Sequence, residues 1–268
     1  MASFSVVSNI AAANAQANLT VTNIGLQRSL NRLSSGFRIN NAGDDAAGLA
    51  VANSYRSAVA VLNQGIRNAN DGLSALQIKD GALNNISNLL DRLSTLATQS
   101  ASASSSVDRT KLNSEFKDVL SEIDREANVA GLTASSGFSV FVSNDGANGV
   151  VGGTISRADT SAQGLNITAL AVDTAAHAAT AVASIATAVG LLGATQSTVG
   201  TLENRLQFAV SLAQSQSVNN KAAESRIRDA NVAEESANLT RYNILTQSGI
   251  AALAQANQTS SSVLTLLR

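Results

Sequence analysis

Few residues in this chain have side chains suited to catalysis or metal binding. Among 268 residues there is one histidine, His177, and there is no cysteine, proline or tryptophan. The chain therefore lacks the residues for a zinc site, for a disulfide and for a histidine-based nucleophilic triad. His177 stands in the first turns of an expected helix, where a solvated or packing role is favoured over catalysis. The sequence predicts no enzyme, no bound metal and no cofactor.

Two acidic motifs have simpler explanations than chemistry. Asp44 and Asp45 form a carboxylate pair, but they precede a long apolar-periodic stretch, so helix capping explains them better. Asn144-Asp145-Gly146, followed by Gly152-Gly153, is similar to a calcium-binding turn. Its acidic ligands are too few for such a loop, and Asn-Asp-Gly is a strong hairpin-turn signal.

Composition excludes several classes of partner. The formal net charge of −1 and pI near 5.8 give no basic face for nucleic acid. We find no uninterrupted run of 18 apolar residues and predict no membrane insertion. The first 19 residues lack a basic segment and are broken by polar residues, so we expect no cleaved secretory signal. With aromatics at 3%, the core must pack small residues in thin helical layers.

Apolar periodicity predicts three helices in the first half. The first covers residues 1–34 and ends at Ser34-Ser35-Gly36. The second extends from Asp45 to Ser100, with an apolar residue at alternating spacings of four and three, as in a coiled coil. A third begins at a capping Asp108 and ends at Gly131.

The middle of the chain differs in kind. Residues 138–143 are β-branched and aromatic, and short strands are also expected at 150–151, 154–155 and 165–168. Helix returns at Asp173, and residues 214–230 are polar enough to suggest a transition. From Val232 the helical pattern continues to the C-terminus.

These elements predict a mainly α fold: a long antiparallel coiled-coil rod with both termini at one end and a small β-hairpin module at the other. The expected parts are a terminal coiled coil built from 1–40 and 229–268, rod segments 41–132 and 173–228, and a β-rich tip at 133–172.

Both ends of the chain bear apolar stripes that one compact subunit could not easily cover. Chain ends usually fray unless something docks them. We therefore predict that the stripes pack on each other, on another copy of the chain, or on both. The residues assigned to self-assembly are Leu19, Leu26, Leu30, Leu33, Ile250, Leu253, Leu264 and Leu267, and Ile10 belongs to the N-terminal stripe.

Four segments carry a resemblance to a known family. Residues 33–53 (LSSGFRINNAGDDAAGLAVAN), 67–73 (RNANDGL), 231–241 (NVAEESANLTR) and 263–268 (VLTLLR) occur in the order and at the spacing of bacterial flagellins. The resemblance covers roughly residues 1–130 and 175–268. The middle is short, so the large outer domains of many flagellins are missing.

The resemblance implies a structural subunit that polymerises into the bacterial flagellar filament for swimming. It implies an extracellular protein, exported unfolded and uncut, with an export chaperone at the C-terminal helices and hook-associated and cap proteins as further partners. A hook–filament junction protein or a surface adhesin on a flagellin frame are the alternatives. The full agreement at 34–53 and 67–73 favours a filament flagellin.

The resemblance also suggests contacts on the surface. Arg92, Leu96 and Glu115 align with positions that a flagellin-sensing Toll-like receptor of the host contacts. The alternative is that Leu96 packs in the helical seam and Arg92 is a solvated neighbour. Ser94 and Thr95 depart from strongly active relatives, so weakened binding is expected. Candidates for O-glycosylation are Ser139, Ser143, Thr154 and Ser156.

Overall fold

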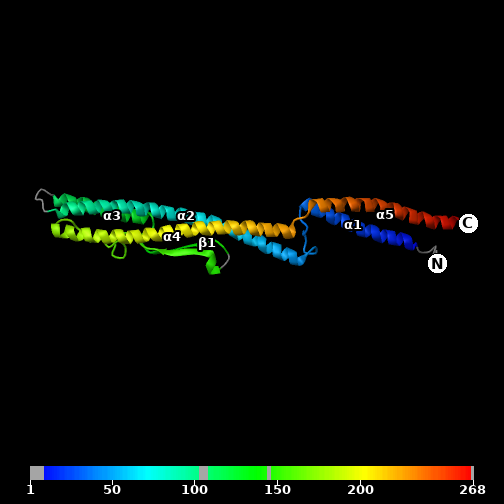
Figure 1. Ribbon diagram of the computed structural model, residues 1–268, viewed down its shortest axis with the longest axis horizontal. Coiled ribbons are helices and arrows are strands. Elements are labelled where there is room, and N and C mark those ends of the chain that lie inside the picture. Colours follow the sequence, from blue (N-terminus) through cyan, green and yellow to red (C-terminus); the bar gives the residue numbers. More distant parts are fainter. Residues whose placement is uncertain (1–8, 103–107, 144–145, 267–268) are drawn as a thin grey trace. The chain divides into compact units, whose positions relative to one another are not determined.

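The computed structural model of the chain describes residues 9–102, 108–143 and 146–266, with side chains in the last helix placed up to Thr259. These residues form five α-helices and one two-stranded antiparallel sheet (Figure 1). The predicted mainly α class with a small hairpin is confirmed. Two compact units are present: residues 1–57 with 219–268, and residues 58–218. Both terminal helices belong to the first unit, and the hairpin belongs to the second.

The first helix boundaries follow from local capping. Helix α1 (Ile10–Ser35) begins after Asn9, whose side chain accepts from the backbone N–H of Ala12 at 3.0 Å. It ends at Gly36, which has a φ of 74° that glycine adopts without strain. Helix α2 (Ala46–Ala101) begins after Asp45, whose carboxylate accepts from Gly48 N–H at 2.8 Å. The predicted stop and the predicted cap are confirmed.

Helix α3 (Arg109–Val129) is closed at both ends. The Asp108 carboxylate accepts from Lys111 N–H at 3.3 Å, and Gly131 has a φ of 65°. Lys79 of α2 donates from Nζ to the carbonyls of Ala130 at 2.8 Å and Gly131 at 3.2 Å. A cation there satisfies carbonyls that the helix leaves free. Partial burial lowers the pKa of Lys79 from its ordinary value.

Helix α4 (Ala175–Arg228) is longer than predicted, and helix α5 (Val232–Leu266) follows it. The transition expected at 214–230 was wrong, because helix continues to Arg228. Polar residues dominate this stretch because only a narrow side of the helix is buried there. Ala213 and Ser217, four residues apart, are buried there, and Ser217 Oγ lies 3.3 Å from Asn63 Oδ1 of α2.

Helices α2 and α4 run antiparallel in a constant register. Gln196 Nε2 donates to Asn84 Oδ1 at 3.3 Å, and Leu206 lies beside Gly72. Helix α3 is also antiparallel to α2, since Lys79 meets the end of α3 and Arg92 meets Glu115. The three helices enclose a core of Leu, Ile and Ala with one central aromatic side chain, and its largest buried members are Leu76, Leu83, Ile86, Leu90, Leu93, Phe116 and Ile123.

The hairpin packs on α2 and α4 where α3 is absent. Strands β1 (Ser136–Phe141) and β2 (Val150–Ile155) pair with Val140 opposite Val151, and a 3-10 turn at Gly146–Gly149 precedes β2. The start of the predicted Asn144-Asp145-Gly146 turn lies outside the described residues. Gly65 of α2 touches the backbone at Val142: a Cβ added to Gly65 would lie 1.7 Å from that carbonyl oxygen.

The strand expected at 165–168 was wrong, because this segment forms turns. Leu165 and Ile167 are buried, so their apolar character reflects core packing rather than strand pairing. Asn166 between them adopts a φ of 57°, a conformation that asparagine tolerates better than most residues.

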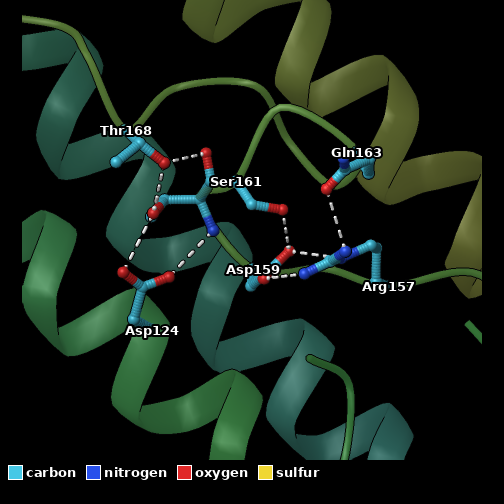
Figure 2. Close-up of polar contacts among 7 residues, drawn as sticks. Asp124, Arg157, Asp159, Ser161, Gln163 and Thr168 are labelled. Carbon is cyan, nitrogen blue, oxygen red and sulfur yellow. Dashed lines mark hydrogen bonds and ion pairs between the residues drawn. The ribbon is translucent and has the colours of Figure 1, made fainter. Parts of the chain in front are cut away.

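Polar contacts fix the loop that contains these turns (Figure 2). The Asp124 carboxylate of α3 accepts from the backbone N–H and the hydroxyl of Thr160, each at 2.9 Å. Arg157 donates from two nitrogens to Asp159 at 3.0 and 2.6 Å, and Ser161 Oγ donates to Asp159 at 2.9 Å. Asp159 and Thr160 are buried, so these bonds satisfy groups that would otherwise cost stability.

By length and composition alone, α4 is the one helix in the described part of the chain that is apolar enough to cross a membrane. Its most apolar stretch has a mean hydropathy of 1.6, and 33% of that stretch is buried within the protein. Core helices of proteins that never enter a membrane meet the same criterion. The expected lack of membrane insertion stays a prediction.

The close approach at Gly65 can be tested against a second glycine of the same helix. Gly65→Ala should lower the free energy of unfolding by roughly 1–3 kcal/mol, because the added methyl group overlaps the Val142 carbonyl. Gly81→Ala should instead raise it by about 0.5–1 kcal/mol, since nothing lies within 4 Å of the new methyl. Urea unfolding followed by circular dichroism measures both, and equal effects would contradict the proposed hairpin contact.

Candidate functional site

The terminal helices α1 and α5 form an antiparallel pair. At one end, Asn9 Nδ2 donates to the carbonyl of Ala256 at 2.9 Å. At the other, Arg32 Nη1 lies 3.0 Å from Glu235 Oε1. The two terminal helices therefore dock on each other, which was one of the arrangements that the apolar stripes predicted.

Small residues bring the two helices close together. A Cβ added to Gly25 would lie 2.6 Å from the Tyr242 ring, and one added to Gly249 would lie 3.1 Å from Leu19 Cδ1. Each glycine thus receives a bulky side chain of the opposite helix. Because glycine has no side chain, a bulky side chain of the opposite helix fits over it, and the two helices can pack closely.

The residues predicted for self-assembly divide between this contact and the surface. Leu19, Leu26 and Leu33 recur every seven residues and are half-buried, as is Leu253 of α5. Leu30 and Ile250 are exposed. Leu264 lies where α5 side chains are not described, and Leu267 is outside the described residues. Much of the predicted stripe on α1 therefore faces the chain's own C-terminal helix.

The opposite side of α1 is apolar and uncovered. Ile10, Val21 and Ile24 are 63%, 68% and 53% exposed, and they lie about half a turn of the helix away from Leu19. On α5, Ile244 is also more than half exposed. Sequence analysis named Ile10 but missed Val21 and Ile24, although their spacings of eleven and three residues place them on one helix side.

A short backbone bridge follows the end of α1. Phe37 pairs with Asp229, Arg38 N–H donates to the Arg228 carbonyl at 2.6 Å, and Ala230 N–H donates to the Gly36 carbonyl at 2.9 Å. The Arg228 guanidinium lies 4.2 Å from the centre of the Phe37 ring, a cation–π contact. This bridge fixes the segments that leave α1 and enter α5.

The acidic pair behaves as capping predicts. Asp45 caps α2, and the Asp44 carboxylate accepts from the backbone N–H groups of Asn41 at 3.2 Å and Asn40 at 3.3 Å. The bond from Asn41 is the main cause that lowers the pKa of Asp44. Asp44 also lines a polar cleft of about 330 Å³ with Arg28 and Arg32 of α1.

The described residues offer no arrangement for metal chemistry. Among them no three His, Cys, Asp or Glu side chains cluster in a way that could hold a metal ion. His177 is exposed, and its Nδ1 lies 2.6 Å from Asp173 Oδ1, four residues earlier on the surface.

Comparison with known proteins identifies the family. The bacterial flagellin N-terminal helical region matches residues 6–142, and the bacterial flagellin C-terminal helical region matches residues 171–267. The chain belongs to the bacterial flagellin family. These matches cover both terminal helices and the core helices between them.

Relatives of this flagellin match it along almost its whole length. A flagellar filament 33 kDa core protein of Treponema phagedenis is 35% identical, covering 97% of this chain and 98% of the relative. A flagellin of Halalkalibacterium halodurans is also 35% identical, and flagellin FlaB1 of Treponema pallidum is 32% identical, with the same coverage. The flagellin is a structural subunit of the bacterial flagellar filament, which is extracellular and serves motility.

The structure brings two of the three candidate receptor residues of this flagellin together on the surface. Arg92 Nε donates to Glu115 Oε1 at 3.0 Å, and both side chains are exposed. Leu96 is only 1% exposed and belongs to the core between α2 and α3. Its side chain therefore packs in the seam, which was the alternative given above, and does not face a receptor.

The candidate glycosylation positions lie on and beside the hairpin of the flagellin. Ser139, Thr154 and Ser156 are exposed, and Ser143 is half-buried. Ser139 and Thr154 belong to β1 and β2, on the side that faces away from the helices.

The ion pair between α1 and α5 can be tested by removing one partner or both. The Glu235 side chain is 9% exposed, and Arg32 is its ion-pair partner. Arg32→Met should lower the free energy of unfolding by roughly 2–4 kcal/mol, because it leaves a buried carboxylate unpaired.

The double variant Arg32→Met with Glu235→Leu provides the control. It should recover most of the loss, because an apolar pair of similar volume replaces the ions. Urea unfolding at neutral pH measures all three proteins. A double variant as unstable as Arg32→Met would show that the pair does not act through its charges.

Proposed function

We propose that the flagellin polymerises through the α1–α5 pair, with a separate task for each side of α1. Leu19, Leu26 and Leu33 close the pair within one subunit. Ile10, Val21 and Ile24 on the other side pack against a neighbouring subunit. The observation that supports this division is the exposure of three large aliphatic side chains on one face of α1.

The energetics favour burial of this outer face. Covering an exposed Val or Ile side chain contributes about 1.5–3 kcal/mol. Three such side chains in each subunit, repeated along a filament, offset part of the entropy lost on association. We extend the same proposal, from the family pattern, to the exposed residues Leu30 and Ile250 and to Leu264 and Leu267.

Further partners rest on the resemblance alone. We propose an export chaperone that binds the C-terminal helix α5 and hook-associated and cap proteins that meet the filament ends. No catalytic activity is proposed. In support, the single histidine is exposed and pairs with a surface aspartate.

We also propose recognition by the host receptor through the exposed Arg92–Glu115 pair. An arginine at the surface is a frequent hot-spot residue. Leu96 contributes indirectly, since it holds the helix that presents Arg92. Binding weaker than in strongly active relatives is expected, given Ser94 and Thr95.

We also propose export with an uncut N-terminus and O-glycosylation at one or more of Ser139, Ser143, Thr154 and Ser156. One measurement tests both proposals. Intact-mass spectrometry of filament protein gives the mass of the whole chain plus any sugar. A mass lower than that of the whole chain would contradict uncut export, and an unmodified mass would contradict glycosylation.

The separate roles proposed for the two sides of α1 predict two distinct defects, one in polymerisation and one in monomer stability. Val21→Asp should abolish polymerisation and leave the helix content and unfolding midpoint of the monomer unchanged, because Val21 is exposed within the subunit. Leu19→Asp should lower monomer stability by about 2 kcal/mol or more, because it places a charge in the α1–α5 contact. Sedimentation of filaments and urea unfolding measure the two effects.

Gln16→Asp supplies the matched control, since Gln16 is an exposed polar residue of the same helix. It should polymerise as the unaltered protein does. Filaments of normal yield from Val21→Asp would reject the outer face as an assembly surface.

Receptor binding gives a third test. Arg92→Ala should weaken binding of monomer to the receptor about tenfold, the scale of a moderate hot spot. Arg67→Ala, which removes another exposed arginine of α2, should leave it unchanged. Equal affinities for unaltered protein and Arg92→Ala, or no binding by either, would contradict the assignment of Arg92 to receptor binding.

A further inference from the structure

A polar cleft lies between the C-terminal half of α1 and the loop that follows this helix. Its volume of about 330 Å³ is in the range of sites for small molecules. Its polar lining comes from one side of α1 and from the loop, namely Gln27, Arg28, Asn31, Arg32, Asn41 and Asp44. All of these residues belong to one compact unit, so the cleft is complete within a single subunit.

The hydrogen-bonding groups on the helix side of the cleft are largely unused. Within the part of the chain that the structure describes, the side chains of Gln27, Arg28 and Asn31 make no hydrogen bond. Arg32 Nη1 meets Glu235, but Arg32 Nε is buried and has no acceptor among the described residues. A buried donor without an acceptor costs stability. Its acceptor must therefore come from outside the chain.

The charges of the lining select the sign of the occupant. Arg28 and Arg32 are positive, and Asp44 is the only acidic residue among those that line the cleft. The Asp44 carboxylate already accepts from the N–H groups of Asn41 at 3.2 Å and Asn40 at 3.3 Å. The bond from Asn41 is the main cause that lowers the pKa of Asp44, and the charges of Arg32 and Arg28 act in the same direction. Asp44 is thus ionised at neutral pH, and the lining keeps an excess of one positive charge.

Arg28 has the chemistry to hold an anion. Its side chain is exposed, and its planar guanidinium carries five N–H donors that match two oxygens of a carboxylate or a phosphate. The amides of Gln27 and Asn31, on the same side of the helix, offer donors to further oxygens. A cation in the same place would be repelled by both guanidinium groups.

We propose that this cleft binds a small oxyanion, an ion or organic molecule with a carboxylate or phosphate group. Arg28 holds the oxyanion by two parallel hydrogen bonds, and Arg32 and the neighbouring amides bind its remaining oxygens. Hydrogen bonds to charged groups predict a dissociation constant on the order of 5 mM. The site lies within one subunit, so the proposal goes beyond the filament function and does not depend on it.

Chemical modification of arginine tests the site directly. Phenylglyoxal reacts with accessible guanidinium groups, and peptide mass spectrometry gives the rate at each arginine of the full-length monomer. At about 20 mM inorganic phosphate, the reaction of Arg28 should be about fivefold slower than in chloride of the same ionic strength. Arg56, an exposed arginine of α2 in the same unit and outside the cleft, should react at the same rate in both. Acetate in place of phosphate tests the carboxylate.

Two variants should act in opposite directions. Asp44→Asn should lower the phosphate concentration that half-protects Arg28 about fivefold, because one nearby negative charge is removed. The amide oxygen of asparagine can still accept from Asn40 and Asn41, so the loop keeps its hydrogen bonds.

Arg28→Gln should remove the stabilisation that phosphate provides. When phosphate replaces chloride, the thermal midpoint should rise about 2 °C less in this variant than in the unaltered protein. Arg56→Gln is the matched control and should keep the full rise, because Arg56 does not line the cleft.

The outcomes separate the possible occupants. Protection of Arg28 by phosphate alone, by acetate alone or by both supports the site and gives the group that it prefers. If neither anion protects Arg28, water supplies the acceptor of Arg32 and the proposal is wrong. Equal protection of Arg28 and Arg56 would show screening by ions in general, and an unchanged phosphate requirement in Asp44→Asn would place the anion outside the cleft. Either result overturns the proposal and leaves the filament function intact.

Discussion

The need to cover the apolar seam of α2 determines the arrangement of the central part of the chain. A helix of 56 residues is unstable in water unless its apolar side is buried, and from Leu62 to Ala97 that side lies in the core. Helix α4 covers it along its length in a fixed antiparallel register, and α3 closes the remaining side from Lys79 to Arg92. The hairpin takes the place of a third helix near Gly65 and Gly72, where the missing side chains let strands approach.

Local signals predicted the elements well. Caps at Asp45 and Asp108 and the stops at Gly36 and Gly131 act through hydrogen bonds within a few residues, so they can be read directly from the sequence. Residues 165–168 were mistaken for a strand because apolar residues that pack a loop into a core resemble a short strand. Residues 214–228 were mistaken for a transition because a helix with a narrow buried side has a mostly polar composition.

The functional surfaces were harder to predict, for a related reason. An apolar residue on an amphipathic helix can face the subunit's own core, its own partner helix or another molecule, and periodicity alone does not separate these cases. Leu19 meets Gly249 within the subunit, whereas Val21, two residues away, is exposed. Leu96, which was named from a family resemblance, is buried. A resemblance gives a residue's position along the chain and not the direction of its side chain, so it could not show this burial. In a flagellin, helix faces of all three kinds are required.

The pairing of the first helix with the last also bears on when the chain can fold. Asn9 and Ala256 are 247 residues apart, Arg32 and Glu235 are 203 apart, and Asn63 and Ser217 are 154 apart. Contacts between such distant segments form only after large loops close, which slows folding. While a ribosome is still making the chain, α1 lacks its partner α5 until the C-terminal part has been made. Long sequence separation therefore delays the α1–α5 pair until α5 has been made, whereas contacts between α2 and α3, such as Arg92 with Glu115, can form earlier.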